Sequence, residues 1–272
     1  MLDLMTELMK STAYGRCIDY RQSNPKENRN LDDHMREAAI EAEKLGYDNV
    51  VIAAAALHDI AKPDSVLVTQ HGIKTYPHHA EHGEALLRRE IASIKSDPMM
   101  ALRGINVKKT EVERMLFLVR HHEDYAYYRQ ADVPDNHPYL RVVNEETVAE
   151  RILEDSIGIT SPQITNELQV KHICRRAISG DNRPFYSSRL YKVPPLRPEM
   201  YIKVMGEPNE EAYKQLVQLM RVNILAQAVE YEQNGRKYTA KEKLMVADKI
   251  EEVLPESIEI VNETLDAIRY TG

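Results

Sequence analysis

The amino-acid sequence predicts an all-α protein, in which a helical bundle is interrupted by a long mixed insert before its last core helices. Apolar residues recur at helical spacing through much of the first 122 residues, and capping residues or glycines bound these stretches. Most of the prolines fall instead between residues 129 and 238. We therefore expect the core to comprise residues 1–128 and 239–272, with residues 129–238 forming an insert or lid.

The first two core helices are predicted from their boundaries. Residues 31–45 read as a helix that Gly46 ends, which places His34 in its first turn. Asp48 or Asn49 caps the next helix, which contains the run VVIAAAALHDIAK. Because this run is almost uniformly apolar, the helix must be buried at the centre of the protein.

Three further helices follow in order along the chain. Residues 79–96 carry an apolar stripe at helical spacing, and residues 110–122 begin with a capping box formed by Thr110 and Glu113. The stretch 210–233 is amphipathic at helical spacing and lies inside the expected insert. The last core helix is expected after residue 239.

Composition limits the class of protein. The chain has 272 residues, 43% of them apolar, which is enough for a large core, and its formal net charge is −7. An acidic chain is unsuited to coat nucleic acid, so nucleic acid is not an expected partner. Cys17 and Cys174 are far apart and are expected to be reduced thiols in a cytoplasmic protein. No apolar run reaches the roughly 18 residues of a membrane span, so no membrane partner is expected.

His58 and Asp59 are adjacent metal-ligand side chains at the end of the apolar helix. Neighbours on a helix project about 100° apart, so the pair can close on one ion only if other helices supply the remaining ligands. A buried histidine or carboxylate without a partner is costly, and a metal ion would supply that partner. Further candidate ligands lie elsewhere in the chain: His34, His79, the doublet His121-His122, and Asp248. Asp124 and Asp181 are alternatives to Asp248.

Five segments carry a resemblance to a known family. LDDHMREAA, ALHDIAK, HHAEHGEALL and LVRHHE, between residues 30 and 125, together with VADKIEE further on, resemble the HD superfamily of metal-dependent phosphohydrolases. The resemblance implies an HD-domain helical bundle, with Asp59 as a catalytic residue that can bridge two ions. It also implies a set of metal ligands: His34, His58, Asp59, His79, His121, His122 and Asp248.

The number and kind of ions follow from these ligands. His34, His58, Asp59 and Asp248 would suffice for one ion. His79 and the histidine doublet match binuclear members of the superfamily, so two ions are expected. Mixed imidazole and carboxylate ligands suit divalent transition metals, namely Mn, Fe, Co, Ni or Zn.

Other residues are expected to contact the substrate. Lys62, three residues after Asp59, can neutralise a phosphate oxygen as charge develops, although a solvated lysine is the alternative. His82 lies one helical turn after His79 and is expected to face the substrate. Basic and aromatic residues are interleaved in one stretch of the insert, which either binds a nucleotide or a nucleic-acid single strand, or is a solvated surface. The arginines of this stretch are Arg175, Arg176, Arg183 and Arg189.

The resemblance to the HD superfamily, with these residues in place, implies a metal-dependent phosphohydrolase, either a phosphomonoesterase or a phosphodiesterase. Its expected substrate is a small-molecule phosphate ester, in the first place a nucleotide, attacked by metal-activated water. Two alternatives stay open. An HD-type diiron oxygenase would use the same ligands, and a metal-stabilised nucleotide-binding regulatory module would have no turnover. A homo-oligomer also stays open.

Overall fold

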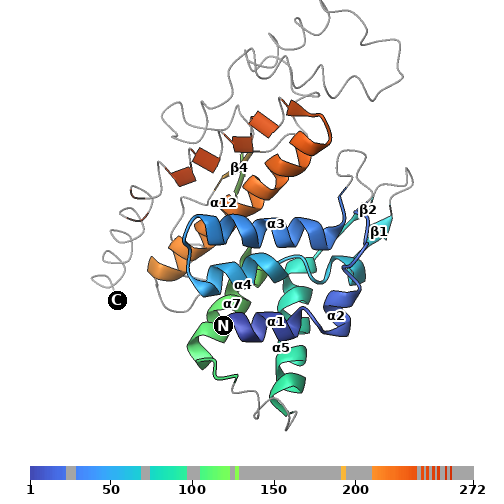
Figure 1. Cartoon of the computed structure of the whole chain (residues 1–272), viewed down its shortest axis with the longest axis vertical. Helices are drawn as coiled ribbons and strands as arrows, with labels where there is room; N and C mark the ends of the chain where they lie inside the picture. The colour runs from blue at the N-terminus through green and yellow to red at the C-terminus, as the bar shows by residue number, and fades with distance from the viewer. Residues whose placement is uncertain are drawn as a thin grey trace, which may run out of the picture.

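The computed structural model is predominantly helical, as the sequence predicts (Figure 1). It describes residues 1–22, 29–68, 74–96, 105–122, 126–128, 191–193 and 210–237, with single positions between 240 and 258. In this part of the chain no helix is long and apolar enough to cross a membrane. The helical elements are α1 (Leu2–Leu8), α2 (Thr12–Gly15), α3 (Leu31–Lys44), α4 (Asn49–Leu57), the 3-10 turn η1 (Lys62–Asp64), α5 (His79–Ser96), α7 (Lys109–His121) and α12 (Glu210–Gln233).

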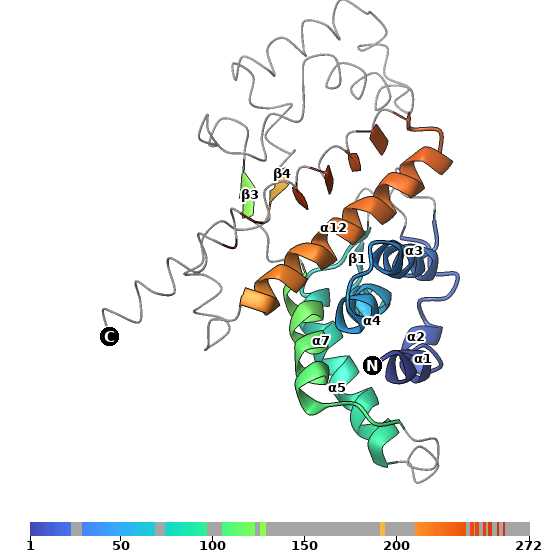
Figure 2. The same ribbon diagram turned by 60° about the vertical axis from the view of Figure 1, so that its left-hand side comes forward.

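Helix α4 is the central element of the bundle, as its apolar sequence predicts. It packs against α1, α3, α7 and α12, and nearly all of its side chains are buried (Figure 2). Its N-cap is Asp48, whose carboxylate accepts hydrogen bonds from the backbone N–H groups of Val50 at 2.8 Å and Val51 at 3.0 Å. Alanines along α4 let the neighbouring helices approach closely, so the end of α4 is held firmly by its surroundings.

Helix α3 presents a buried stripe to α4. Leu31, Met35, Ala38 and Ala42 are all fully buried, at the spacing of one helical face. The helix ends after Lys44 because Gly46 adopts a φ of +68°, a left-handed conformation that closes helices. The sequence prediction for this helix is therefore confirmed.

Helices α5 and α7 pack side by side and approach each other closely at Gly83. A Cβ atom at Gly83 would lie 3.3 Å from the side chain of Val119 on α7. The predicted capping box at Thr110 and Glu113 is wrong, because α7 begins at Lys109 and Glu111 accepts a hydrogen bond from the N–H of Lys108 at 3.3 Å. Glu113 instead forms a two-pronged ion pair with Arg88 of α5, at 3.0 and 2.7 Å.

Helix α12 is the feature that departs most from the expected domain organisation. The sequence places residues 210–233 in the insert, whereas α12 packs along α3 and also contacts α4 and α7 (Figures 1 and 2). It buries apolar residues such as Tyr213, Leu216 and Leu219 in the same core as α4. The helical core therefore includes α12, and the rest of the expected insert lies mostly outside the described residues.

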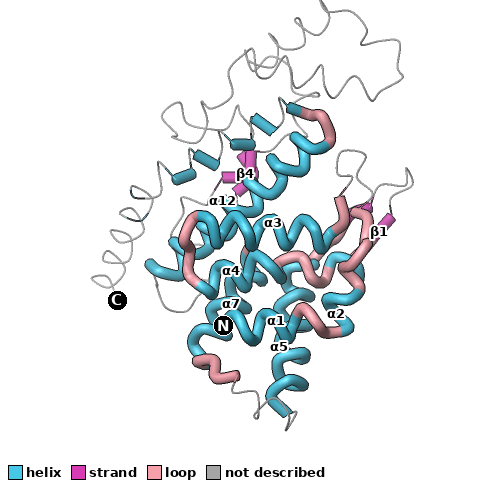
Figure 3. The backbone as a smooth tube through the Cα atoms, in the orientation of Figure 1, coloured by secondary structure: helices cyan, strands magenta, loops and turns pink. Residues whose placement is uncertain are grey.

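Short strands accompany the helices, as the tube drawing shows (Figure 3). Strands β1 (Leu67–Val68) and β2 (Lys74–Thr75) form an antiparallel pair between η1 and α5. Strand β3 (Ala126–Tyr128) follows α7 and pairs with β4 (Tyr191–Val193), with Tyr127 opposite Lys192. The second pair ties one point of the expected insert to the end of α7.

Candidate metal centre

The carboxylate of Asp59 is the centre of a buried cluster of histidines. Its Oδ1 atom lies 3.1 Å from Nε2 of His79 and 3.4 Å from Nε2 of His122. Its Oδ2 atom lies 3.3 Å from Nε2 of His58 and 3.9 Å from Nε2 of His34. We call Oδ1 with His79 and His122 the α5–α7 half, and Oδ2 with His34 and His58 the α3–α4 half. Each half has the composition and compactness of a site for a metal ion, and the two share Asp59.

Four segments of the core bring these side chains together. His34 lies in the first turn of α3, His58 caps the C-terminal end of α4, His79 begins α5, and His122 caps the C-terminal end of α7. Asp59 follows His58 where the chain leaves α4 for η1. The site therefore depends on the packing of the whole bundle and not on one loop, which makes it a pre-organised site.

Main-chain carbonyl groups fix the orientation of three of the four imidazoles. The Nδ1 atoms of His58, His79 and His122 lie 2.8, 2.7 and 2.6 Å from the carbonyl oxygens of the residues three positions earlier. A carbonyl oxygen can only accept, so in the neutral imidazole the proton sits on Nδ1 and Nε2 carries a lone pair. All three lone pairs therefore point into the cluster, as they do in metal-bound histidines.

The spacing of these atoms fits a bound ion better than a hydrogen-bond network. Nε2 of His79 and Nε2 of His122 are 3.2 Å apart, yet neither holds a proton in this tautomer. Two ligands about 2.1 Å from one ion, at angles between 90° and tetrahedral, lie about 3.0–3.4 Å apart. Nε2 of His58 and Nδ1 of His34 are also buried without a hydrogen-bond partner among the described residues. A metal ion would satisfy atoms that are otherwise costly to bury.

The protonation states of the cluster also suit metal binding. Burial lowers the pKa of His34 to about 3 and lowers the pKa of His122, so both rings are neutral at pH 7. Burial by itself would raise the pKa of Asp59, but the charge of Lys62, together with smaller contributions from the neighbouring histidines, outweighs it and holds that pKa well below its usual range. Neutral imidazoles around an ionised carboxylate are the forms that coordinate metals.

Lys62 places its ammonium group beside the centre. Its Nζ atom lies 2.6 Å from Oδ2 of Asp59 and donates to Oε1 of Gln22 at 3.1 Å. The same atom lies 5.5 Å from the centre of the Tyr76 ring, and the hydroxyl of Tyr76 donates to the backbone oxygen of Gln22 at 2.8 Å. Sequence reasoning proposed Lys62 but missed Gln22 and Tyr76, because neither belongs to a patterned stretch.

Two of the predicted ligands lie away from both halves. His121 turns from the centre and packs its ring against Phe117, with the ring centres 4.5 Å apart. Adjacent residues on a helix project in different directions, so only His122 of the doublet reaches Asp59. The side chain of Asp248 is exposed, and among the described residues it belongs to neither group.

Asn223 of α12 is a neighbour of the centre that the sequence analysis did not identify. It is half-buried, and its side-chain amide near His34 partly offsets the fall in the pKa of that histidine. The signal that could have found it is the position of α12 in the core, which the sequence assigned to the insert. The predicted residues Arg175, Arg176 and Arg183 lie outside the described residues.

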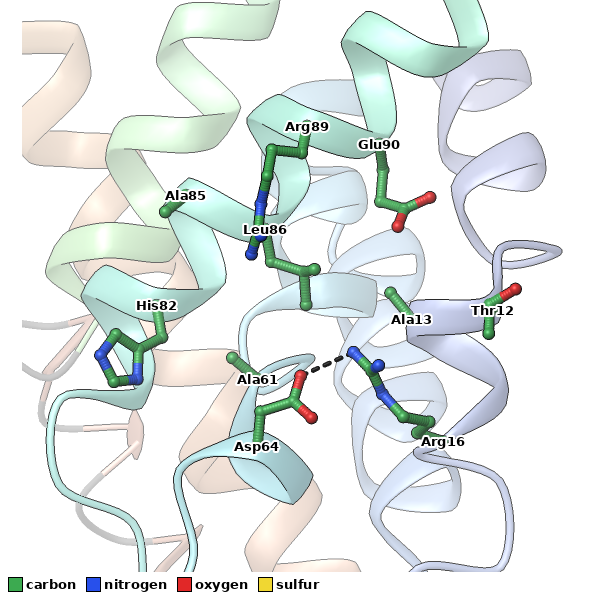
Figure 4. Close-up of a pocket in the computed structure, with 10 residues that line it drawn as sticks. All are labelled: Thr12, Ala13, Arg16, Ala61, Asp64, His82, Ala85, Leu86, Arg89 and Glu90. Carbon is green, nitrogen blue, oxygen red and sulfur yellow. Dashed lines mark hydrogen bonds and ion pairs between the residues drawn. The ribbon is translucent and has the colours of Figure 1, made fainter.

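His82 lines a cavity next to the metal centre. The cavity has a volume of about 590 Å³ and lies between α2, η1 and α5, with Arg16, Asp64 and Arg89 on its walls (Figure 4). None of the five clustered ligands lines it. The Nδ1 atom of His82 is 2.8 Å from the hydroxyl of Ser65, and Arg16 pairs with Asp64 at 2.6 Å. His82 therefore faces this cavity and not Asp59.

Comparison with protein-family models, with curated proteins and with solved structures gave no match for this chain. The site is therefore characterised by its own geometry: one carboxylate, that of Asp59, shared by two pairs of histidines.

Proposed function

We propose that this chain is a metal-dependent phosphohydrolase of the HD superfamily that hydrolyses a nucleotide phosphate ester. The observation that carries the proposal is the orientation of Asp59, which presents one carboxylate oxygen to His79 and His122 and the other to His34 and His58. Such a carboxylate is suited to hold two divalent ions as a bridge, and the HD-type sequence segments support the same reading.

Two bound ions would activate a water molecule and stabilise the negative charge of a phosphoryl group. The chain's own residues supply the remaining parts. Asp59 contributes one carboxylate oxygen to each half of the centre and so fixes their relative position. The three histidines anchored to carbonyl groups keep their lone pairs directed towards the centre. The Lys62 ammonium, held by Gln22, is placed to offset charge that develops on a phosphate oxygen.

The test is a hydrolysis screen with defined metals. The chelator-treated protein is reloaded with Mn²⁺, Co²⁺, Ni²⁺, Zn²⁺ or Fe²⁺ and is assayed for release of phosphate or nucleoside from mono-, tri- and cyclic nucleotides. We expect turnover with at least one metal, loss of it in Asp59→Ala, and retention of it in Asp248→Asn, whose side chain is exposed. Absence of turnover in protein that carries two ions would reject the proposal.

A diiron oxygenase is the second candidate, and the donor set is the observation that favours it. Among the described residues the centre offers four imidazoles and a single carboxylate, a nitrogen-rich set that binds iron well. Oxygen uptake that depends on both iron and substrate, with no hydrolysis under anaerobic conditions, would identify this activity. Tight nucleotide binding without turnover under either condition would identify a regulatory module instead.

The expected insert supplies a separate test of the nucleotide substrate. If its arginines meet the phosphates, replacing Arg175, Arg176, Arg183 and Arg189 with Gln should raise KM and weaken its dependence on salt. The value of kcat should change less, because groups remote from phosphorus supply binding that is equal in ground and transition states. Unchanged kinetics at low salt would show that this stretch is a solvated surface.

A further inference from the structure

We infer that the two halves of the centre fill in a fixed order, with the α5–α7 half first and the α3–α4 half second, and that the Lys62 ammonium occupies the second half until an ion displaces it. This inference rests on the proposed two-ion centre and concerns how that centre is assembled. It follows from two differences between the halves and from the charge that they share.

The first difference is geometric pre-organisation. In the α5–α7 half, the three distances between Oδ1 of Asp59, Nε2 of His79 and Nε2 of His122 are 3.1, 3.2 and 3.4 Å. All three fall within the range expected for neighbouring ligands of one ion, about 3.0–3.4 Å. Both rings are also anchored through Nδ1 to carbonyl oxygens. An ion can enter this half with little rearrangement of its ligands.

The α3–α4 half is less well prepared. Nε2 of His34 is 3.9 Å from Oδ2 of Asp59, outside that range, and Nδ1 of His34 is buried without a hydrogen-bond partner among the described residues. An imidazole without a partner on its second nitrogen is a less basic and less firmly oriented ligand. An ion in this half must therefore draw His34 inward before it is fully bound.

The charge that the two halves share makes the second binding event weaker than the first. The two halves share Asp59, and among the described residues neither group contains another carboxylate. A neighbour of His34 on α12 is Asn223, a neutral amide, so this contact adds no negative charge beside His34. Once an ion occupies the α5–α7 half, the charge of Asp59 is already offset, and a second ion meets repulsion from the first.

The second difference is the position of Lys62. Its ammonium contacts Oδ2, the oxygen of the α3–α4 half, at 2.6 Å. A dication bound to Oδ2 must displace this ammonium, whereas an ion bound to Oδ1 need not. Gln22 at 3.1 Å and the Tyr76 ring at 5.5 Å offer the ammonium other partners, so it can withdraw from Asp59 without leaving the site. Lys62 thus acts as a built-in competitor of the second ion.

Calorimetric titration of chelator-treated protein with Mn²⁺ or Zn²⁺ tests the order of binding directly. We expect two events with dissociation constants that differ by at least about tenfold, the size of effect that supporting interactions around a metal have on affinity. His122→Ala should remove the tighter event, and His34→Ala should remove only the weaker one. A single event for two ions, or loss of the tighter event in His34→Ala, would overturn the assigned order.

Variants of Lys62 and Asn223 test the cause of the difference. Lys62→Met should tighten the second event by about tenfold and change the first much less, since it removes the competing charge from Oδ2. Asn223→Asp should also tighten the second event, because it adds a carboxylate beside His34. Lys95→Met, on the exposed side of α5, is the matched control and should change neither event.

If Lys62→Met leaves the second dissociation constant unchanged, or shifts both constants equally, the competitor role of Lys62 is wrong. Circular dichroism of each variant verifies that its helix content is retained. These results are independent of the proposed activity, because the assay measures metal affinity. Two well-separated binding events without hydrolysis would reject the phosphohydrolase and leave the order of binding intact.

Discussion

His79 and His122 present their Nε2 atoms to each other at 3.2 Å while both Nδ1 atoms face main-chain carbonyl oxygens. In the metal-free protein this arrangement brings two lone pairs together in a buried site, which is unfavourable. A cation converts the same geometry into ligation. Metal binding at this centre would therefore be coupled to folding, because the unfolded chain does not hold these side chains together.

Metal removal should accordingly lower the stability of the fold. At a free metal concentration 100 times the dissociation constant of one site, binding contributes about 2.7 kcal/mol to the free energy of unfolding. Thermal unfolding with and without a chelator measures this effect, and re-addition of Mn²⁺ or Zn²⁺ should restore the Tm. Equal Tm values before and after full metal removal would contradict the coupling.

The histidine doublet offers a matched pair of variants. His122→Ala removes a ligand that lies 3.4 Å from Asp59, so metal analysis should show about one ion fewer per chain. His121→Ala should leave the metal content unchanged, because its ring packs against Phe117. A loss of metal in His121→Ala comparable to that in His122→Ala would show that both residues bind ions.

The helices were predictable because their signals are local. Asp48, Gly46 and the apolar run after Asn49 each act within one or two helical turns, so sequence reasoning found the ends of α3 and the start of α4. The start of α7 was misplaced, since Glu113 has a stronger partner in Arg88 of α5 than in the N-terminus of its own helix. Long-range partners of this kind leave no local pattern.

The centre was predictable in its residue types but not in its full membership. Asp59 with His34, His58 and His79 could be proposed because metal ligands within apolar helices need a partner. Which member of the doublet turns inward depends on the angle at which α7 meets α4, and spacing does not encode this angle. Asn223 was missed for a similar reason, because the packing of α12 on α3 is a long-range contact across more than 160 residues of chain.

The sequence predicts Asp248 as a metal ligand, and variants of this residue test that prediction. Its side chain is exposed and lies in neither group of clustered ligands, so Asp248→Ala should keep the metal content of the wild-type protein. Asp59→Ala, measured in parallel, should lose both ions because the two halves share this residue. If Asp248→Ala loses one ion per chain, Asp248 is a ligand and the helix that carries it must approach Asp59.

The N-cap of α4 should contribute measurably to stability. The Asp48 carboxylate accepts from the N–H groups of Val50 and Val51, and its second oxygen accepts from Gln215 of α12. Asp48→Ala should lower the free energy of unfolding by about 1–2 kcal/mol, as measured by urea denaturation in the presence of a chelator. Asp48→Asn retains a capping oxygen and should lose much less. Equal losses in both variants would show that the cap contributes nothing beyond the charge of Asp48.

The metal-free protein should lose stability as the pH falls below about 6.5, the pKa that an exposed histidine has. Burial holds the pKa of His34 at about 3 and that of His122 below 6.5, so between these values the unfolded chain binds more protons than the folded chain. Stability is then fully present above pH 6.5 and falls towards pH 3, by up to about 1.4 kcal/mol per pH unit for each such histidine. Urea denaturation at several pH values measures how the free energy of unfolding changes with pH. His34→Gln should reduce this slope by the contribution of one histidine. An unchanged slope in His34→Gln would mean that this ring is already protonated in the folded, metal-free protein.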